Sequence, residues 1–516
     1  MASSQRSKYS RDADLELPEL GARGWLRWIW RQLTSMRTAL LLLLLLAAAA
    51  IPGSVYPQRS ADPNGVTQFL DNNPSLGKFL DTLQLFDVYT SVWFSAIYIL
   101  LFVSLIGCVL PRTRVHFDAL RAEPPVAPKL FSRMPAHASH KSRRPNLLAV
   151  AESVLRDNRY RVVVTGDSIA AERGYLRETG NLIFHFSLIG VLLAVGLGGG
   201  FSYSGQRVLV EGETFVNNLT GYDSISPGAF FNEGQLVPFK VTLDKFAASF
   251  DLKNRTNIGT PLDFRATVTS QVGQAGKPAQ SVIRVNEPLG LPRANVYLTG
   301  NGYAPAITIR DAAGNIVFSG ATPFLPQDAN YTSLGVIKVP DAKTQFGLIA
   351  FFYPTAAELT TGALTSTFPA AVNPMLTANV YVGDLGLDSG KPQNVYSLDI
   401  KKMKQVAGGK SGVKGIRLTV GQSTRLPGSL GTITFDGLKR FASLDVSYNP
   451  GEGWVLFFAL SALGGLVLSL LVPRRRVWVR KVSGGFEIAA LARGDDPTLE
   501  KVIEELADEI KQDKDE

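Results

Sequence analysis

Cysteine and histidine are both scarce in this chain of 516 residues. A single cysteine, Cys108, excludes a disulfide within the chain, a CxxC redox pair and a zinc site built from cysteines. The only histidines are His116, His137, His140 and His185. Any thiol chemistry therefore belongs to a partner, and each histidine needs its own explanation.

Charged residues are also few, at 19% of the chain against 45% hydrophobic residues. These averages indicate apolar spans joined to a sizeable water-soluble part. The net charge of +9 is concentrated beside the apolar runs, and no nucleic-acid-binding motif accompanies it. We therefore expect no nucleic-acid role.

Four apolar runs reach the length of about 20 residues that a membrane helix needs. They predict spans at 38–56, 92–110, 182–200 and 454–472, and none of them contains Asp or Glu. The AAAA in the first run resembles a signal-peptide cleavage site. A long leader that contains acids, and the three spans that follow, favour a retained helix instead.

Lysine and arginine indicate the orientation of the spans, because they collect on the cytoplasmic side. They cluster in WLRWIWRQLTSMR, PRTR, HKSRRP and PRRRVWVRK. We thus expect a cytoplasmic leader (1–37), middle segment (111–181) and tail (473–516). The loop 57–91 and the long segment 201–453 are expected outside.

The segment 201–453 shows short alternating runs such as VPFKVTLDKF and DFRATVTSQV, separated by Gly, Pro, Asn and Asp. This pattern predicts an all-β extracytoplasmic domain, a sandwich or open barrel of roughly ten or more strands. AAGN at 312–315 is typical of a hairpin turn. The predicted fold class is an integral membrane protein with four transmembrane helices, this β domain and a small α+β cytoplasmic element.

The cytoplasmic element is predicted from 111–181 and the tail. Residues 122–145 form a Pro-rich basic linker. Its His137 and His140 lack a third metal ligand nearby, so solvated linker residues are favoured over a metal site. NLLAVAESVLRDN predicts a helix, and two later segment pairs predict hairpins that share one sheet. Asp496 is placed to begin a final helix.

His185 is the one histidine inside a predicted span, and His116 is expected at the membrane interface. An ionisable residue in a span is costly, so a functional role is the default hypothesis. Leu188, Ile189 and Leu192 continue its face, and Gly190 with Ala194 would admit another helix closely. An imidazole in an apolar wall suits haem iron, whereas a metal alone would need more ligands and a proton relay would need membrane acids. An interfacial histidine bonded to a neighbouring helix is the alternative.

Several motifs together resemble the ResB family, also called CcsB, of system II cytochrome c biogenesis, in its actinobacterial form. The likeness covers residues 25–480. The motifs that carry it are SMRTALLLLLL, LFDVYTSVWFSAIYILLFVSLIGCVLPR, GYLRETGNLIFHFSLIGVLLAVGLGG, VEGETF, RVNEPLG, GNGYAP, FLPQDANYTSLGVIKVPDA, FFYPTA and YNPGEGWVLFFALSALGGLVLSLLVPRRRVWVR.

The resemblance implies a haem-handling subunit of a cytochrome c synthase in the bacterial plasma membrane, with both termini cytoplasmic. It implies a CcsA or ResC-type membrane partner, apocytochrome c as substrate and a thioredoxin-like thiol reductase. The complex would carry haem b outward without holding it permanently and join it to apocytochrome thiols. His185 matches the family's membrane histidine, so it is expected to be an axial haem ligand. The chain is not expected to be catalytic alone.

Relatives often show histidine where Glu287 and Asn301 stand here, and this chain has no histidine in the external segment. An external imidazole role is therefore in doubt. Docking of the substrate protein or the partner is the hypothesis for the motif residues, with turn and core positions as the alternative. These residues are Asn286, Glu287, Tyr297, Tyr303 and Asp328.

Two other functions stay open at this stage. One is a membrane-anchored scaffold whose β domain recruits envelope or respiratory assembly factors, with His185 purely structural. The other is a redox carrier subunit that uses a b-type haem.

Overall fold

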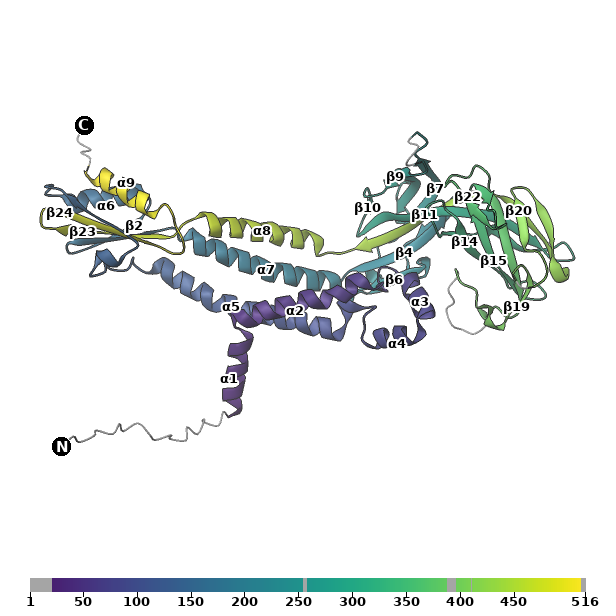
Figure 1. The fold of residues 1–516 in the computed structure, drawn as a ribbon, viewed down its shortest axis with the longest axis horizontal. Helices are drawn as coiled ribbons and strands as arrows, with labels where there is room; N and C mark the ends of the chain where they lie inside the picture. The colour runs from purple at the N-terminus through teal and green to yellow at the C-terminus, as the bar shows by residue number, and fades with distance from the viewer. Residues whose placement is uncertain (1–20, 254–257, 388–395, 410, 512–516) are drawn as a thin grey trace. The chain divides into compact units, whose positions relative to one another are not determined.

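The computed structural model describes residues 21–253, 258–387, 396–409 and 411–511. The first 20 residues of the predicted leader and the last five of the tail lie outside this range. The chain divides into two compact units: a membrane unit (Met1–Gly198 with Gly451–Glu516) and a β domain (Gly199–Pro450). Figure 1 labels their elements.

Within its described residues, the membrane unit contains four helices that are long and apolar enough to span a bilayer, with mean hydropathies of 2.1 to 2.4. This confirms the prediction of four membrane helices. They are α2 (Met36–Val55), α5 (Val92–Arg121), α7 (Leu176–Gly200) and α8 (Glu452–Leu471).

Two of these helices extend beyond their apolar runs. α5 continues past Pro111 to Arg121, and α7 begins at Leu176 before the run at 182. Charged residues end the apolar run but not the helix, because Arg and Glu have high helix propensity. His116 therefore lies on α5, buried against α7, where an interfacial position was predicted.

Short helices precede and follow α2. α1 (Ala22–Leu33) lies before it, and the Ser35 side chain accepts a hydrogen bond from the Thr38 backbone N–H at 3.1 Å to begin α2. The loop 57–91 holds α3 (Pro63–Asn72) and α4 (Pro74–Thr82), followed by the 3-10 turn η1 (Val88–Thr90). Asp62 caps α3, with Pro63 at its first position.

The small α+β element is a five-stranded antiparallel sheet covered on one face by two helices (Figure 1). β3 pairs with β23, which confirms that the two predicted hairpins share one sheet. The helices are α6 (Leu147–Asp157) and α9 (Leu499–Lys511). The strand order is β1 (Ala136–Lys141), β24 (Gly485–Ala492), β23 (Arg475–Val482), β3 (Ser168–Arg173) and β2 (Arg161–Thr165).

The prediction that residues 122–145 form a linker was wrong, because part of this segment belongs to the sheet. Its residues 136–141 form β1, the edge strand paired with β24. The stretch before it, which includes the 3-10 turn η2 (Phe131–Arg133), covers the second face of the sheet. There the Trp478 indole N–H donates to the Pro125 carbonyl at 2.8 Å. Proline favours extended chain, which suits a strand edge as well as a linker.

His137 and His140 are consequently strand residues rather than linker residues; His137 is exposed to solvent, as predicted, whereas His140 is half-buried. His140 lies opposite Phe486 on β24, with their ring centroids 5.4 Å apart. Burial, together with the nearby Lys511, lowers the pKa of His140. Among the described residues, no group of three or more His, Cys, Asp or Glu side chains is placed to hold a metal ion.

The β domain is built around two long antiparallel strands, β11 (Ala294–Arg310) and β22 (Gly431–Tyr448). They form the middle of a seven-stranded sheet. β-Bulges interrupt their register between Leu298 and Gly300 and between Ala306 and Ile307. The other strands of this sheet are β10 (Leu289–Leu291), β4 (Tyr203–Val210), β6 (Ser224–Pro227), β12 (Ile316–Ala321) and β21 (Ser423–Leu426).

The two ends of this long sheet pack against two different sheets. One end contacts a four-stranded sheet of β5 (Thr214–Val216), β7 (Phe239–Phe250), β8 (Pro261–Val272) and β9 (Ala279–Arg284). The other contacts a six-stranded sheet of β13 (Leu325–Pro326), β14 (Ser333–Val339), β15 (Phe346–Tyr353), β18 (Met375–Val382), β19 (Lys404–Ala407) and β20 (Ile416–Thr419). A separate hairpin joins β16 (Ala356–Glu358) to β17 (Leu364–Ser366).

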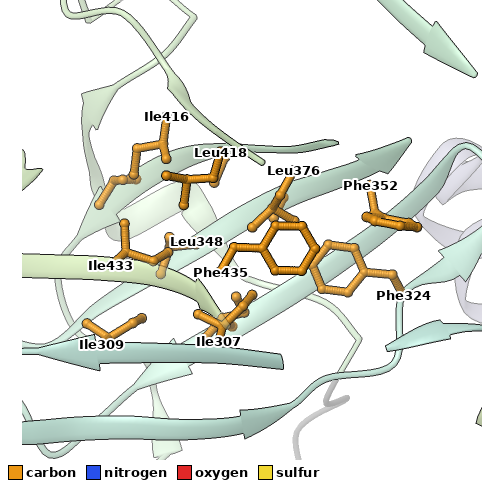
Figure 2. Packing of buried hydrophobic residues seen from close by; sticks show 14 of the residues in the cluster. Ile307, Ile309, Phe324, Leu348, Phe352, Leu376, Ile416, Leu418, Ile433 and Phe435 are labelled. Carbon is orange, nitrogen blue, oxygen red and sulfur yellow. The ribbon is translucent and has the colours of Figure 1, made fainter. Parts of the chain in front are cut away.

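Figure 2 shows the second of these cores, where Phe435 of β22 lies among Leu348, Leu376 and Phe352 of the six-stranded sheet. Each such buried side chain stabilises the fold by about 1.5–3 kcal/mol. The predicted turn at 312–315 joins β11 to β12 as a hairpin. The predicted β-rich domain is therefore confirmed, as a pair of packed-sheet cores that share one long sheet.

Candidate functional site

His185 lies in the first half of α7, and its ring is half-buried. Its Nδ1 lies 2.7 Å from the Asn181 carbonyl oxygen, one turn earlier. Because a carbonyl only accepts, Nδ1 must carry the proton and donate it. In the neutral ring, Nε2 then keeps its lone pair, and no hydrogen bond engages Nε2 within the described part of the chain. This is the tautomer that a metal-ligating histidine adopts when its other nitrogen is held by a backbone carbonyl.

The side of α7 opposite His185 packs against α8. Ser187, Gly190 and Ala194 are buried and lie roughly 140–200° round the helix from His185, at about 100° per residue. A Cβ on Gly190 would meet the Phe458 ring of α8 at 2.4 Å. The small pair Gly190 and Ala194 thus faces a neighbouring helix, as predicted, although Gly190 receives an aromatic ring rather than a backbone.

The backbones of α7 and α8 approach each other closely where Gly180 and Phe184 of α7 meet Gly465 of α8. A Cβ on Gly465 would lie 2.6 Å from the Phe184 nitrogen and 2.7 Å from the Gly180 carbonyl oxygen. Only glycine fits at such a crossing. On another side, the Tyr98 hydroxyl of α5 donates to the Leu192 carbonyl. α7 is therefore held by α5 and α8, and His185 lies on the helix face opposite Ser187, Gly190 and Ala194.

A cavity of about 540 Å³ lies on the His185 face, toward the start of α7. α7 contributes Glu178, Asn181 and Leu182 to it, which stand seven, four and three residues before His185. At 1.5 Å per residue they lie about 4–11 Å from His185 along the helix axis. The rest of the lining comes from α5 and the sheet: Pro111, Arg112, Val115, His116, Ala119, Arg474, Arg476 and Arg493.

Ion pairs hold the arginines of the sheet in this lining. Arg474 donates through Nε to Glu172 at 2.8 Å and also pairs with Glu178. Arg476 binds Glu172 at 3.0 Å, and Arg493 binds Glu178. Burial opposes ionisation of Glu172, but the hydrogen bonds from Arg474 and Arg476 outweigh it and leave the pKa of its carboxyl lowered. This network fastens the start of α7 to β3 and β23.

His116 is a site residue that the sequence analysis missed. It is 7% exposed, and its Nε2 lies 3.0 Å from the Thr179 hydroxyl of α7. Its Nδ1 has no hydrogen-bond partner within the described residues, and Glu178 Oε2 lies 3.9 Å away. It also lines a second, apolar cavity of about 400 Å³ between α5, α7 and α8. The interfacial position predicted for His116 stays a prediction, and the structure adds that its side chain is buried between α5 and α7.

The five motif residues of the β domain do not form one cluster of exposed side chains. Asn286 adopts a positive φ of 64° in the tight turn between Arg284 and Glu287, whose backbones bond to each other. The Asp328 carboxylate accepts from the backbone of Asn330 at 2.9 Å and Thr332 at 3.0 Å, as in an Asx turn. These geometries account for Asn286 and Asp328 as turn formers.

The two tyrosines lie on β11. Tyr297 is half-buried, and Tyr303 is 3% exposed, with its hydroxyl donating to the Pro369 carbonyl at 2.9 Å. Tyr303 therefore belongs to the core of the domain and presents no docking surface of its own. Glu287 is exposed at the end of its turn.

Arg440 on β22 organises the surroundings of Tyr303, and no sequence motif predicted this role. Its guanidinium lies 4.5 Å from the Tyr303 ring centroid and 5.1 Å from that of Phe246. Its Nη2 donates to the Asn301 side chain at 2.8 Å. Burial lowers the pKa of Arg440. The Asn301 side chain is thus occupied as an acceptor for a buried cation.

Comparison with known proteins places this arrangement in a family. The sequence profile of the ResB-like family matches residues 36–504, which is most of the chain. The chain belongs to the ResB-like family. The matched range includes all four membrane helices, His185 and the whole β domain.

Relatives with the same family character are named for cytochrome c biogenesis. The chain is 30% identical over 305 residues to the cytochrome c biogenesis protein CcsB of Synechococcus sp. (strain CC9311), covering 55% of this chain and 62% of that protein. It is 29% identical over 198 residues to CcsB of Prochlorococcus marinus (strain MIT 9312), covering 37% and 46%. CcsB of Synechococcus elongatus is 25% identical over 474 residues, or 89% and 87%. The first two matches thus span about half of those relatives, whereas the third spans nearly all.

Proposed function

We propose that this ResB-like protein is the haem-handling subunit of a system II cytochrome c synthase. In this proposal His185 Nε2 binds the iron of haem b while the haem is carried through the membrane. Haem is cargo rather than a resident cofactor. The final reaction adds a cysteine S–H of apocytochrome c across each haem vinyl group and forms a thioether, and it is performed by the complex.

The tautomer of His185 is the observation that supports this proposal most strongly. The bond from Nδ1 to Asn181 leaves the lone pair on Nε2, as iron ligation requires. A histidine kept only for packing would instead be expected to bond a neighbouring helix through its ring. Apolar residues continue the same face, which suits a porphyrin.

The position of His185 on α7 supports the need for a second subunit. It lies on the face of α7 opposite the buried residues that pack against α8, and His116 has its Nε2 against Thr179 and its buried Nδ1 3.9 Å from Glu178 Oε2. A second axial ligand is therefore proposed to come from a CcsA or ResC-type membrane partner. A thioredoxin-like thiol reductase would supply reduced apocytochrome thiols.

We further propose a bacterial plasma membrane location with both termini and the five-stranded sheet in the cytoplasm. The basic segments support this through their distribution. Arg59, one of two cations in the loop 57–91, is paired with Asp81 at 2.6 Å and with Asp87, so this loop offers little free positive charge.

The β domain is proposed to dock apocytochrome c or to brace the partner. Four of the five motif residues are accessible for contact with such a partner: the exposed Asn286, Glu287 and Asp328 and the half-buried Tyr297. Tyr303 would act only indirectly, by holding the Arg440 cluster in place.

Absorption spectroscopy of the protein purified with its CcsA-type partner tests the proposal. We expect a Soret band in the wild-type complex and its loss, or a large loss of retained haem, in His185→Ala. Leu193→Ala, on an exposed part of the same helix, is the matched control and should keep the band. Unchanged haem in His185→Ala would favour a membrane scaffold, and a haem that cycles with quinol would favour a redox carrier.

A further inference from the structure

The positive charge that lines the cavity toward the start of α7 is only partly neutralised by ion pairs. Four guanidinium groups line it, from Arg112, Arg474, Arg476 and Arg493. Two carboxylates neutralise part of this charge: Glu178, which also lines the cavity, and Glu172, which pairs with Arg474 and Arg476. The remainder is an excess of two positive charges beside an apolar membrane region.

Arg112 is the lining arginine that takes no part in the ion pairs with Glu172 and Glu178. It lies on α5, whereas the other three arginines belong to the sheet or flank its strands, and its Nη2 contacts the Met36 sulfur. A thioether is a weak acceptor. No carboxylate pairs with Arg112 among the residues that the structure describes. A guanidinium in this setting is suited to bind a carboxylate with two parallel hydrogen bonds.

Position connects this charge to His185. The α7 residues of the cavity precede His185 on the same face by one to two turns. A flat ligand whose metal is bound at Nε2 and whose edge lies parallel to α7 would extend into the cavity. Haem has this form, with both propionate carboxylates on one edge and an apolar remainder.

We propose that this cavity binds the propionate carboxylates of haem, with Arg112 as the principal partner, and so fixes the direction in which haem enters. This inference rests on the proposed function. Arg474, Arg476 and Arg493 complete the positive field, while their pairs with Glu172 and Glu178 keep them in place. His185 would then supply iron affinity, and the cavity would supply orientation.

A comparison of haem with haem dimethyl ester, in which both propionates are esterified, tests the proposal. The full chain, purified with its CcsA-type partner and placed in phosphatidylcholine nanodiscs, is titrated with each and followed at the Soret band. We expect the wild type to bind haem about tenfold more tightly than the ester, a difference of about 1.4 kcal/mol. Arg112→Gln should lose this preference by weakening haem alone. Arg112→Lys should keep most of it, and Arg114→Gln, two residues along α5, should behave as the wild type.

Equal binding of haem and ester by the wild type, both abolished by His185→Ala, would overturn the inference and leave the proposed function intact. Absence of binding of either ligand to the wild type would instead remove the proposed function. The preference for haem should also persist in nanodiscs that contain phosphatidylglycerol. Its disappearance there would assign the cavity to lipid headgroups and contradict the proposal.

Discussion

Glu172→Gln tests the ion-pair network that fastens α7 to the sheet. Glu172 is 3% exposed and accepts from Arg474 and Arg476, so the substitution leaves Arg476 without a carboxylate and Arg474 with Glu178 alone. Removing one partner of a buried pair costs about 3–5 kcal/mol. Glutamine keeps the shape and one acceptor oxygen, so we expect the lower end, about 3 kcal/mol.

Hydrogen exchange followed by mass spectrometry measures this locally, in peptides from β3 and β23. A loss of about 3 kcal/mol corresponds to roughly 100-fold lower protection. Glu152→Gln is the matched control, because its pair with Arg156 on α6 lies at the surface. Exposed pairs of this kind contribute about 0.5 kcal/mol.

The pH dependence has a definite sign. The pKa of Glu172 is lowered from its ordinary 4.5, so its stabilisation is complete above that value and is lost as the pH falls through the lower folded-state pKa. The difference between wild type and Glu172→Gln should therefore shrink in acid. Equal protection in Glu172→Gln and Glu152→Gln at neutral pH would refute the reasoning.

Two further predictions concern packing. Gly465→Ala should push α7 and α8 apart, lower the stability measured by thermal unfolding by about 1–3 kcal/mol and reduce haem retention. Gly464→Ala, whose added Cβ has no atom within 4 Å, should change neither quantity, and equal effects of the two variants would contradict the close crossing. Arg440→Gln should lower the Tm, followed by the β-sheet circular dichroism signal, by about 5 °C, because the contacts with the aromatic rings are lost. The control Arg425→Gln, at an exposed position, should leave the Tm unchanged. An unchanged Tm in Arg440→Gln would refute the structural role of Arg440.

Local pattern was sufficient for much of the fold. Apolar length alone located the four membrane helices, and alternation with turn residues predicted the β domain. The shared sheet of the membrane unit also followed, because two hairpins with one apolar face each need a common cover. Those features depend on neighbours in sequence.

Features that depend on distant segments did not follow. The strand β1 was hidden in a Pro-rich basic stretch, since only its pairing with β24 makes it a strand. Arg440 and His116 show no local signal, because their roles come from residues far along the chain. The long shared sheet of the β domain likewise depends on the pairing of β11 with β22 across more than a hundred residues.

His185 marks the limit of sequence reasoning most clearly. Its place in an apolar run suggested a ligand, but the choice of nitrogen comes from the Asn181 carbonyl, and the basic cavity beside it comes from four separate segments. The motif residues of the β domain show the opposite case. Asn286 and Asp328 form turns, and Tyr303 lies in the core. A docking role for the five motif residues stays a prediction.

The most direct test of iron ligation by His185 is the yield of mature c-type cytochromes in cells that carry His185→Leu, assayed by haem staining with and without added imidazole. The account predicts that the yield collapses in this variant, is preserved in Leu193→Ala, and is partly restored in the smaller His185→Gly when imidazole is supplied. Normal maturation in His185→Leu cells without imidazole would contradict it.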